Sequence, residues 1–593
     1  MLDVLIKGGE VVDGTGRPRF EADIGIVDGR IVAVGEVSDP ARRTIDATGL
    51  LVTPGWVDIH THYDGQATWD MLLDPSFSSG VTTAILGNCG VGFAPVARGD
   101  EGRLIDLMDG VEEIPGGALH AGLAWNWSSF PEYLDVLDSR PRSFDIGCYL
   151  PHGPLRLYVL GDKVGCGRKA DADEIARMAG LVDQAMEAGA FGVSSSRTSV
   201  HRTIHGDMTP DFEADREELT AIARVVAQHR GVMEFAPSGV VGEDPQGLRA
   251  EMAMFDRIVA ETGVDLHMLL LQPNLDPDYW QEQLDWAARI NAGGHSRVFG
   301  QVSGRSIGAL LSFFGTHPFM ERPGFREVKD TLSRDKWLGA LADPQVKARI
   351  LRETDPEGTF GAFLNQHWNN CFDLGETANY EPDASVNVTV LAAAAGTTAQ
   401  SYVYDMMLKT SRHPRLLLAI NNYVGGGLDK LKPMIEHPAT VLGASDAGAH
   451  VMTICDGSMN SFMLTHWARD RSRGPIIPLE QVVRMMSHDT ARSMGIADRG
   501  TLEPGMRADI NVIDFDKLEL GKPTIVDDLP QGASRLLQPV SGYRMTMVNG
   551  AITREYDEPT GAMPGRLLRH KAGNGALSQR DRARASVPAT HEA

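Results

Sequence analysis

The stretch "PGWVDIHTHYDG", residues 54–65, places two histidines, His60 and His62, behind a run of strand-forming residues. The apolar residues before them predict a short buried strand over residues 57–62, opened by a Pro-Gly pair. Because side chains two positions apart on a strand point to the same face, both imidazoles can meet one metal ion. The alternative is a pair of polar residues satisfied by backbone and water at a strand end.

The composition predicts a soluble globular protein. Hydrophobic residues make up 42% of the 593 residues, and no uninterrupted apolar stretch approaches the roughly 18 to 20 residues that a membrane span needs. This length fits a barrel with insertions plus a satellite domain. The opening "MLDVLIKGGEVVDGTG" lacks the regions of a signal peptide, so we expect a cytoplasmic protein.

Charge and cysteine content restrict the partners. The formal net charge of −23 argues against nucleic acid or an anionic membrane, because both need a basic face. We therefore expect a small-molecule substrate, together with other copies of the chain in a homo-oligomer. The five cysteines are few, odd in number and widely spaced, which predicts reduced thiols without a disulfide framework.

Both ends of the chain have β-texture. Residues 1–56 contain short strand-like runs with hairpin signals at Asp13-Gly14 and Asp28-Gly29, and residues 498–560 contain similar runs with Asn549-Gly550. The two sets have the spacing to pair with each other. We expect one small β-sandwich domain built from both termini.

Between these ends, apolar β-runs alternate with helical stretches, which is typical of βα units and a parallel sheet. Eight such strands close into an α/β fold of the (β/α)₈ TIM-like barrel type over residues 57–497, with its chemistry at the C-terminal ends of the strands. The expected strands are 57–62, 82–88, 145–151, 189–195, 231–237, 264–272, 296–304 and 439–446.

Two segments fall outside this pattern. The connection of about 130 residues from Arg305 to Pro438 is far longer than an ordinary crossover, and we expect an insertion lobe at about 305–438 that covers the barrel mouth. Its aromatic-rich runs suit an apolar substrate wall or packing within the lobe. The tail, residues 561–593, lacks apolar periodicity from Arg566 onward and is predicted to be disordered.

Two further strand ends carry residues that bind metals. Cys89 follows the second strand in "LGNCGVG", and Asp446 ends the eighth in "LGASDAGAH". Cys89 is a thiolate ligand or a small buried hydrophobe. Asp446 either caps a turn or serves as the proton acceptor of a hydrolytic site.

These motifs together resemble the amidohydrolase superfamily, and most closely its N-acyl-D-amino-acid deacylase (D-aminoacylase) branch. The resemblance spans about residues 1 to 560 and implies a metal-binding barrel with a two-part β-sandwich. It rests on "LIKGGEVVDGTG", "PGWVDIHTHYD", "GVTTAILGNCGVGFAP", "AGAFGVSSS", "GASDAG" and "RGTLEPGMRADINVID".

The resemblance implies that His60 and His62 are metal ligands, that Cys89 is the cysteine ligand of the branch, and that Asp446 binds metal and moves the proton. The branch also places histidine ligands near the ends of strands five and six. Here the polar residues in those strands are Glu234, His267 and Gln272.

His267 lies mid-strand among leucines, where we expect a core histidine. Glu234 is the expected additional ligand. The metal is a divalent cation, Zn²⁺ by default for this set of ligand types, with one ion expected and two as the alternative.

The loops at the mouth offer further candidates. No lysine ends strand four, which argues against the carboxylated-lysine bridge of the hydantoinase and dihydroorotase branches. Arg197 and Arg305 follow strands four and seven, and either guanidinium can hold a substrate carboxylate bidentately. His201 and His205 have helical spacing but lie in a loop, so we do not expect a second metal site there.

The sequence thus predicts a metal-dependent hydrolase of a linear amide, resembling the deacylases of N-acyl-D-amino acids. In this hypothesis Asp446 takes a proton from water and passes it to the leaving nitrogen. The alternatives are a hydrolase of another amide or ester in an apolar small molecule, and an amidohydrolase-like scaffold without turnover.

Overall fold

Eight parallel strands form a closed barrel. The computed structural model describes residues 1–165 and 167–571 of the chain. Two parallel sheets share the third strand, which Tyr149 interrupts, and a bridge between Thr61 and Ala447 closes the ring. The strands are β6 (Trp56–Asp58), β7 (Val81–Leu86), β8 (Asp145–Cys148) with β9 (Leu150–Pro151), β10 (Gly192–Ser196), β11 (Val232–Ala236), β12 (Asp265–Leu269), β13 (Val298–Val302) and β17 (Thr440–Leu442).

All eight predicted strands occur, and the (β/α)₈ barrel is confirmed. Most are shorter than expected, and the two that carry the site end early: β6 at Asp58 and β17 at Leu442. The histidine pair and Asp446 therefore lie just beyond their strands, on chain segments that run along the rim of the barrel.

Helices cover the outside of the barrel. Side-chain caps start several of them: Asp171 and Glu174 form a capping box for α5, and Asp215 caps α6. The helices are α1 (Glu101–Glu112), α2 (Gly116–Gly122), α3 (Phe130–Asp138), α4 (His152–Leu160), α5 (Ala172–Ala188), α6 (Arg216–Gln228), α7 (Pro245–Thr262), α8 (Tyr279–Gly293), α15 (Leu431–Glu436), α16 (Met459–Phe462) with the π-helix η8 (Met463–Asp470), and α17 (Leu479–Arg484) with the π-helix η9 (Met485–Asp489) and α18 (Thr490–Ser493).

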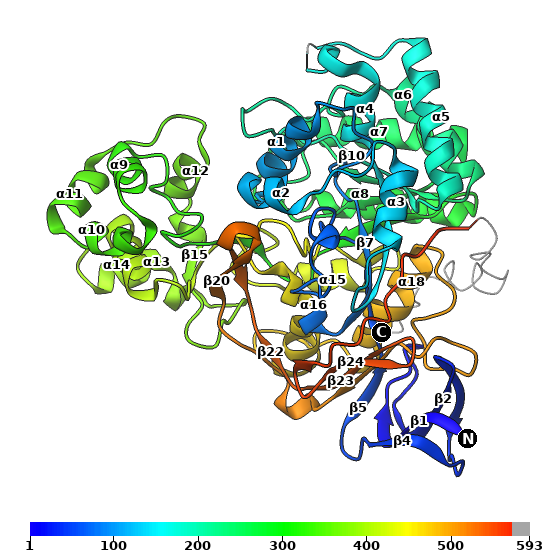
Figure 1. Cartoon of the computed structure of the whole chain (residues 1–593). Coiled ribbons are helices and arrows are strands. Elements are labelled where there is room, and N and C mark those ends of the chain that lie inside the picture. The colour runs from blue at the N-terminus through cyan, green and yellow to red at the C-terminus, as the bar shows by residue number, and fades with distance from the viewer. Residues whose placement is uncertain (166, 572–593) are drawn as a thin grey trace.

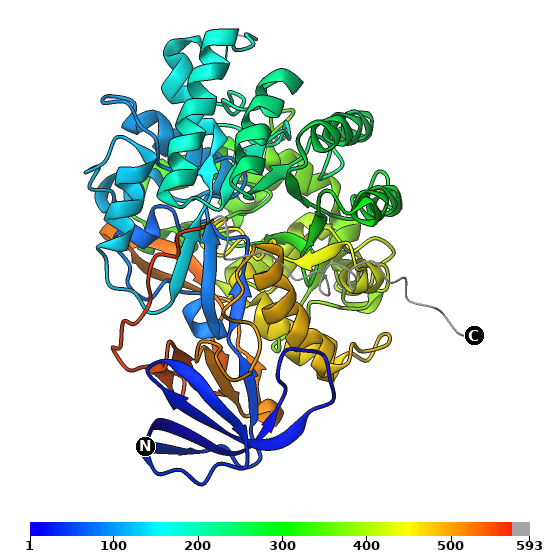
Figure 2. The same cartoon turned by 90° about the vertical axis from the view of Figure 1, so that its right-hand side faces the viewer.

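Strands from both termini share one nine-stranded sheet, which lies beside the barrel in both views (Figures 1 and 2). The turns Asp28-Gly29 and Asn549-Gly550 connect hairpins as predicted, with positive φ at all four residues. Asp13-Gly14 also lies in a hairpin connection, between the antiparallel strands β1 and β2, but that connection is a longer loop over residues 12–19. The strands are β1 (Leu2–Val11), β2 (Phe20–Val27), β3 (Arg30–Gly35), β4 (Ala41–Asp46), β5 (Leu51–Pro54), β18 (Ile510–Ile513), β23 (Tyr543–Val548), β24 (Ala551–Glu555) and β25 (Glu558–Pro559).

The domain boundaries proposed at residues 56, 497 and 560 stay a prediction. Two short antiparallel strand pairs lie between β18 and β23 in the sequence. They are β19 (Glu519–Leu520) with β22 (Val540–Ser541), and β20 (Thr524–Leu529) with β21 (Ala533–Leu537).

The insertion between β13 and β17 is a lobe with its own sheet and its own hydrophobic core (Figure 1). Its predicted aromatic runs supply that core through Phe319 and Phe325, which favours internal packing over a substrate wall. The elements are β14 (Ile307–Leu310), α9 (Pro323–Thr331), α10 (Trp337–Leu341), α11 (Pro344–Arg352), α12 (Phe360–Gln366), β15 (Cys371–Asp373), α13 (Val388–Ala394), α14 (Ala399–Thr410) and β16 (Leu416–Asn421).

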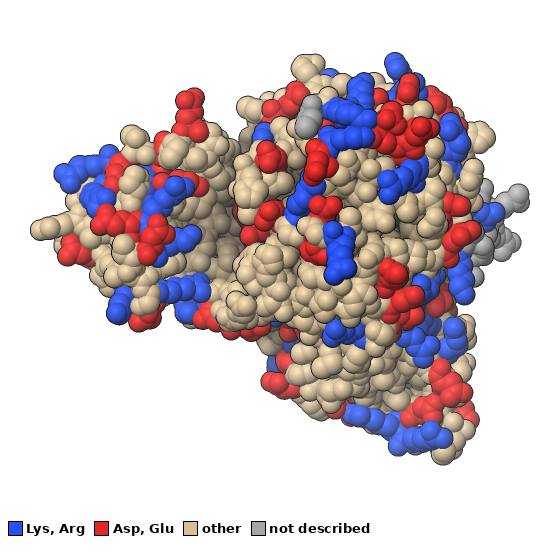
Figure 3. All heavy atoms as spheres, turned by 45° about the horizontal axis from the view of Figure 1, so that its top comes forward, with Lys and Arg blue, Asp and Glu red and all other residues tan. Residues whose placement is uncertain are grey.

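The base of the lobe lies at the C-terminal ends of the barrel strands. Asn422 donates its backbone N–H to the Gln272 carbonyl beyond β12, and Leu310 donates to the Thr453 carbonyl beyond β17. Figure 3 shows a hollow between the lobe and the body of the molecule. Whether the lobe controls access to the barrel stays a prediction.

The C-terminal segment differs from its prediction. Residues 566–571 are ordered against the barrel: Leu567 forms a parallel bridge with Ile146, and His570 donates its backbone N–H to the Gly189 carbonyl. The remaining residues of the predicted disordered tail, 572–593, lie outside the described part of the chain.

Acidic and basic side chains are interspersed on the face shown in Figure 3. None of the helices in the described ranges has the length and apolar character required to cross a bilayer.

Candidate active site

The rim of the barrel brings the predicted strand-one histidines next to the strand-eight aspartate. Thr61 contacts both neighbouring strands, with its backbone N–H bonded to Ile85 and its β-bridge to Ala447. The residues on either side, His60 and His62, then turn to one face. Their Nε2 atoms lie 3.2 Å and 3.6 Å from Oδ1 of Asp446.

Cys89 reaches the same point from the loop after β7. Its Sγ lies 3.4 Å from Nε2 of His60. The Cys89 backbone is left-handed, with φ 55°, a conformation that a non-glycine residue adopts at a cost of about 1–3 kcal/mol. Glycine is required beside it, because a Cβ on Gly90 would lie 2.2 Å from a carboxylate oxygen of Asp211.

Asp446 is also held in a left-handed conformation, with φ 46°. The preceding Ser445 fixes the loop, since its hydroxyl donates to Oδ2 of Asp58 at 2.6 Å and contacts the His60 carbonyl at 3.1 Å. The Asp446 side chain remains 19% exposed, whereas both histidines are fully covered. Asp446 is therefore the member of this group that a substrate or water can approach.

The three side chains His60, His62 and Cys89 fit a metal ion. Their ligand atoms lie within 4.8 Å of one another, and all three residues are buried. Both ring nitrogens of His62 lack a hydrogen-bond partner among the described residues, as does Oε1 of Glu234. Buried polar atoms without partners are costly, and a bound cation would satisfy them.

The pKa values reflect a concentration of negative charge. Burial alone lowers the pKa of His60, but the hydrogen bond and charge of Asp446, with the charge of Glu234, raise it to about 9. Burial opposes ionisation of Asp446, yet the two histidines hold its pKa well below the usual range. A divalent cation would neutralise the same carboxylates that a protonated His60 otherwise neutralises.

Glu234 on β11 faces the ligands from the barrel interior. Its Oε2 accepts the backbone N–H of Cys89 at 2.9 Å, and its Oε1 lies 4.0 Å from Nδ1 of His60. Burial raises the pKa of Glu234 to about 7, against the charge of His60. Direct ligation by Glu234 stays a prediction.

A residue that the sequence did not indicate orients His60. Oε1 of Gln301, on β13, lies 2.6 Å from Nδ1 of His60, and the Gln301 amide nitrogen lies 3.4 Å from Nδ1 of His267. Because an amide oxygen only accepts, the neutral, metal-binding form of His60 carries its proton on Nδ1, and Nε2 faces Cys89 and Asp446. A glutamine in an apolar strand was the available signal. His267 is buried, as expected.

Both arginines proposed for substrate binding are paired within the protein. Arg305 is fully buried, contacts Asp456 at 2.7 Å and lies with its Cζ 3.9 Å from the ring centre of Tyr380. Arg197 pairs with Glu251 at 3.2 Å and donates to three backbone carbonyls. A substrate carboxylate would compete with these bonds, so their binding role stays a prediction.

The two loop histidines, His201 and His205, have different partners and do not form a pair. Nδ1 of His201 lies 2.8 Å from the Ser196 hydroxyl, whereas His205 is exposed beside Asp106. Burial, with the charges of His450 and His62, lowers the pKa of His201 to about 3. His201 is therefore neutral and electrostatically coupled to the site.

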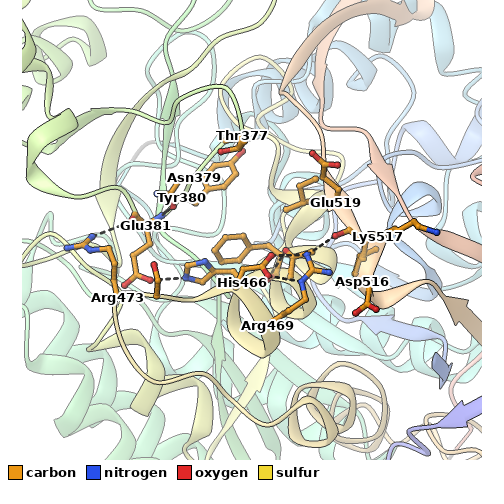
Figure 4. A pocket seen from close by; sticks show the side chains of 17 residues that line it. Thr377, Asn379, Tyr380, Glu381, His466, Arg469, Arg473, Asp516, Lys517 and Glu519 are labelled. Atoms are coloured by element: carbon orange, nitrogen blue, oxygen red, sulfur yellow. Dashed lines mark hydrogen bonds and ion pairs between the residues drawn. The ribbon is translucent and has the colours of Figure 1, made fainter. Parts of the chain in front are cut away.

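A separate cavity of about 500 Å³ lies between the lobe, η8 and the loop before β19 (Figure 4). None of the predicted site residues lines it. Its central groups are already paired, with Glu381 bound to His466 at 2.8 Å and to Arg471 at 2.9 Å. The cavity therefore lies at the junction between the lobe and the barrel, away from the candidate active site.

Comparison with known proteins identifies the group to which this site belongs. The family model described as "Amidohydrolase family" matches residues 43–554. The chain belongs to the amidohydrolase family. Within it, D-aminoacylase of Alcaligenes xylosoxydans xylosoxydans is 27% identical over 574 residues, covering 96% of this chain and 98% of the relative. The chain is thus a metal-dependent amidohydrolase of the D-aminoacylase branch, as its motifs indicated.

Other relatives agree with this placement. N-acyl-D-glutamate deacylase from the same organism is 25% identical over 576 residues, covering 96% of this chain and 97% of the relative. Among solved structures, D-aminoacylase superposes with a TM-score of 0.62 at 24% identity, covering 96% of this chain and 100% of that one. This likeness confirms the barrel and the β-sandwich.

Proposed function

We propose that this amidohydrolase hydrolyses a linear amide, an N-acyl D-amino acid or a related N-acyl compound. The observation that carries the proposal is the convergence of His60, His62 and Cys89 within 4.8 Å, beside the partly exposed carboxylate of Asp446. The full-length similarity to D-aminoacylase and to N-acyl-D-glutamate deacylase supports the substrate class.

The ion we propose is Zn²⁺, which suits imidazole, thiolate and carboxylate ligands. His60, His62, Cys89 and Asp446 would hold it, with Glu234 as a further ligand. A solved D-aminoacylase has a binuclear metal centre in which one metal activates and the second attenuates. We propose one tightly held ion for this chain. The branch places histidine ligands near the ends of strands five and six, and this chain has no histidine at the described ends of those two strands.

Such an ion would polarise the amide carbonyl and make a neighbouring water more acidic. The protein supplies the proton transfer. Asp446, the partly exposed carboxylate, accepts a proton from the water as the water oxygen attacks the carbonyl carbon, and returns that proton to the leaving nitrogen as the C–N bond breaks. Gln301 keeps the proton of His60 on Nδ1 and so preserves Nε2 as a ligand.

The test is a panel of N-acetyl and longer N-acyl derivatives of D- and L-amino acids, assayed on protein of measured metal content. We expect about one tightly bound zinc per chain and hydrolysis of at least one D-series compound. Protein that binds no transition metal, even with added zinc, would support the scaffold alternative. A zinc-loaded protein that cleaves only aryl amides or esters would replace the substrate class.

A further inference from the structure

A buried glutamate behind His62 has no assigned role. Glu112 is the last residue of α1, on the connection after β7, and is 2% exposed. Its Oε1 lies 3.4 Å from Nδ1 of His62. Neither of these two atoms has a hydrogen-bond partner among the described residues, and at this distance each is within reach of the other.

The two edges of the His62 ring have different neighbours. Nε2 faces Asp446 at 3.6 Å, on the side where the ligands converge, while Nδ1 faces Glu112. Since the two nitrogens point away from each other, a carboxylate at Nδ1 cannot reach an ion at Nε2. Glu112 accordingly lies outside the group of convergent ligand atoms, and its contact is with the ring alone.

The position of Glu112 is unfavourable for helix stability. It ends α1 and is followed by Glu113, and the last turn carries no basic residue. The C-terminal end of a helix repels negative charge. Packing also does not require a carboxylate there, because burying one is costly without a partner. The contact with His62 gives this residue a reason to be glutamate.

A histidine of the strand-eight loop holds the glutamate from its other side. Nε2 of His450 lies 3.7 Å from Oε2 of Glu112, and the His450 backbone N–H donates to the Glu112 carbonyl at 2.5 Å. Nδ1 of His450 is in turn 3.2 Å from Glu113, which also accepts from the Thr453 hydroxyl. Glu112 is therefore fixed in place between the ligand and this loop.

We propose that Glu112 is a positioning residue that orients His62 through its Nδ1–H and raises the affinity of the site for its metal. It acts on His62 as Gln301 acts on His60, except that a carboxylate makes the imidazole a stronger ligand than an amide does. The inference rests on the proposed metal site and goes beyond it by assigning the residue that controls His62.

Zinc affinity of the metal-free protein, measured by competition with a chromophoric chelator, tests the proposal. Glu112→Gln keeps the reach of the side chain and removes the charge, whereas Glu112→Asp keeps the charge and removes the reach. We expect both to weaken zinc binding about 10- to 100-fold. The unfolding temperature of each metal-free variant should stay near that of the metal-free wild type, which a purely structural role would not predict.

Glu113→Gln is the matched control, because it removes the same charge one residue away from a side chain that contacts His450 and not a ligand. We expect its zinc affinity within about threefold of wild type. Unchanged affinity in Glu112→Gln, or an equal loss in Glu113→Gln, would overturn the inference. Wild-type protein that binds no zinc would instead overturn the metal site, and the inference with it.

Discussion

Substitution of Asp446 at the rim can separate metal binding from proton transfer. Asp446→Asn keeps the shape and an oxygen donor but cannot accept a proton at neutral pH. We expect the variant to retain some zinc and to lose about 10²- to 10⁴-fold in kcat, the usual contribution of general acid–base catalysis, with a smaller change in KM. Metal content and steady-state kinetics on the best amide check this. Turnover within a few-fold of wild type would remove Asp446 as proton carrier and leave Glu234 as the candidate.

The buried arginine gives a prediction that separates stability from substrate binding. Arg305→Gln leaves Asp456 buried without its ion pair, so we expect a loss of about 3–5 kcal/mol in the free energy of unfolding. The KM of the folded fraction should change little, because the guanidinium already has its partners. Urea denaturation and kinetics on one preparation test both parts. A large rise in KM at unchanged stability would restore the substrate role.

The sequence located the ligand candidates because each ends or follows an apolar strand, and parallel strands bring such ends together. It missed Glu112 for a physical reason. Glu112 lies at the end of an ordinary amphipathic helix, in "MDGVEEIP", where a charged residue is expected to face solvent. Only the packing of α1 against the strand-eight loop shows that this carboxylate is buried.

At the scale of elements, the barrel strands were predictable because a short apolar run between turn residues is too short for a helix and suits a buried strand. The ends of the strands were less predictable, because β6 and β17 stop where the neighbouring strands no longer form ladder hydrogen bonds with them. The lobe could be bounded by its length, but its internal arrangement could not be predicted. Its small sheet orders β14, β16 and β15 across a wide separation in sequence, which no local pattern reports.

The junction between lobe and barrel depends on a buried ion pair, visible in part in Figure 4. Burial opposes ionisation of Glu381, but His466 and Arg471 lower its pKa to about 2. Because the pKa of Glu381 is lower in the folded protein, its ionised carboxylate stabilises the fold at pH values above the unfolded pKa, near 4.5. This contribution is lost as pH falls towards 2.

We therefore expect Glu381→Gln to lower the free energy of unfolding by about 3 kcal/mol at pH 7. The gap to wild type should narrow as pH falls below 4.5. Asp429→Asn is the control, because Asp429 also contacts Arg471 but is 72% exposed, and its loss should cost about 1 kcal/mol or less. Denaturant unfolding at several pH values measures both. A gap that is independent of pH would show that the charge of Glu381 is not what stabilises the junction.

At the scale of the whole molecule, a C-terminal segment packs against the end of the barrel opposite the site, which composition alone could not reveal. Residues 565–571 lack apolar periodicity, yet they run along the starts of the third and fourth strands. Gly565 donates to the Arg142 carbonyl, Ile146 exchanges backbone bonds with residues 566 and 568, and Arg569 pairs with Asp135 at 2.7 Å. Backbone pairing of this kind depends on an open strand edge, not on the hydrophobic pattern of the added segment.

Removing this segment tests whether it belongs to the fold. A chain ending at Pro564 loses these backbone bonds and the burial of Leu567, so we expect unfolding to become easier by about 2–4 kcal/mol. Zinc binding should persist, because the ligands lie at the other end of the strands. A chain ending at Lys571 keeps all of these contacts and should match the full-length protein. Calorimetry with zinc titration compares the three chains. If the shorter truncation unfolds at the wild-type temperature, the segment adds nothing to the barrel; if it loses zinc while still folded, the two ends of the barrel are coupled.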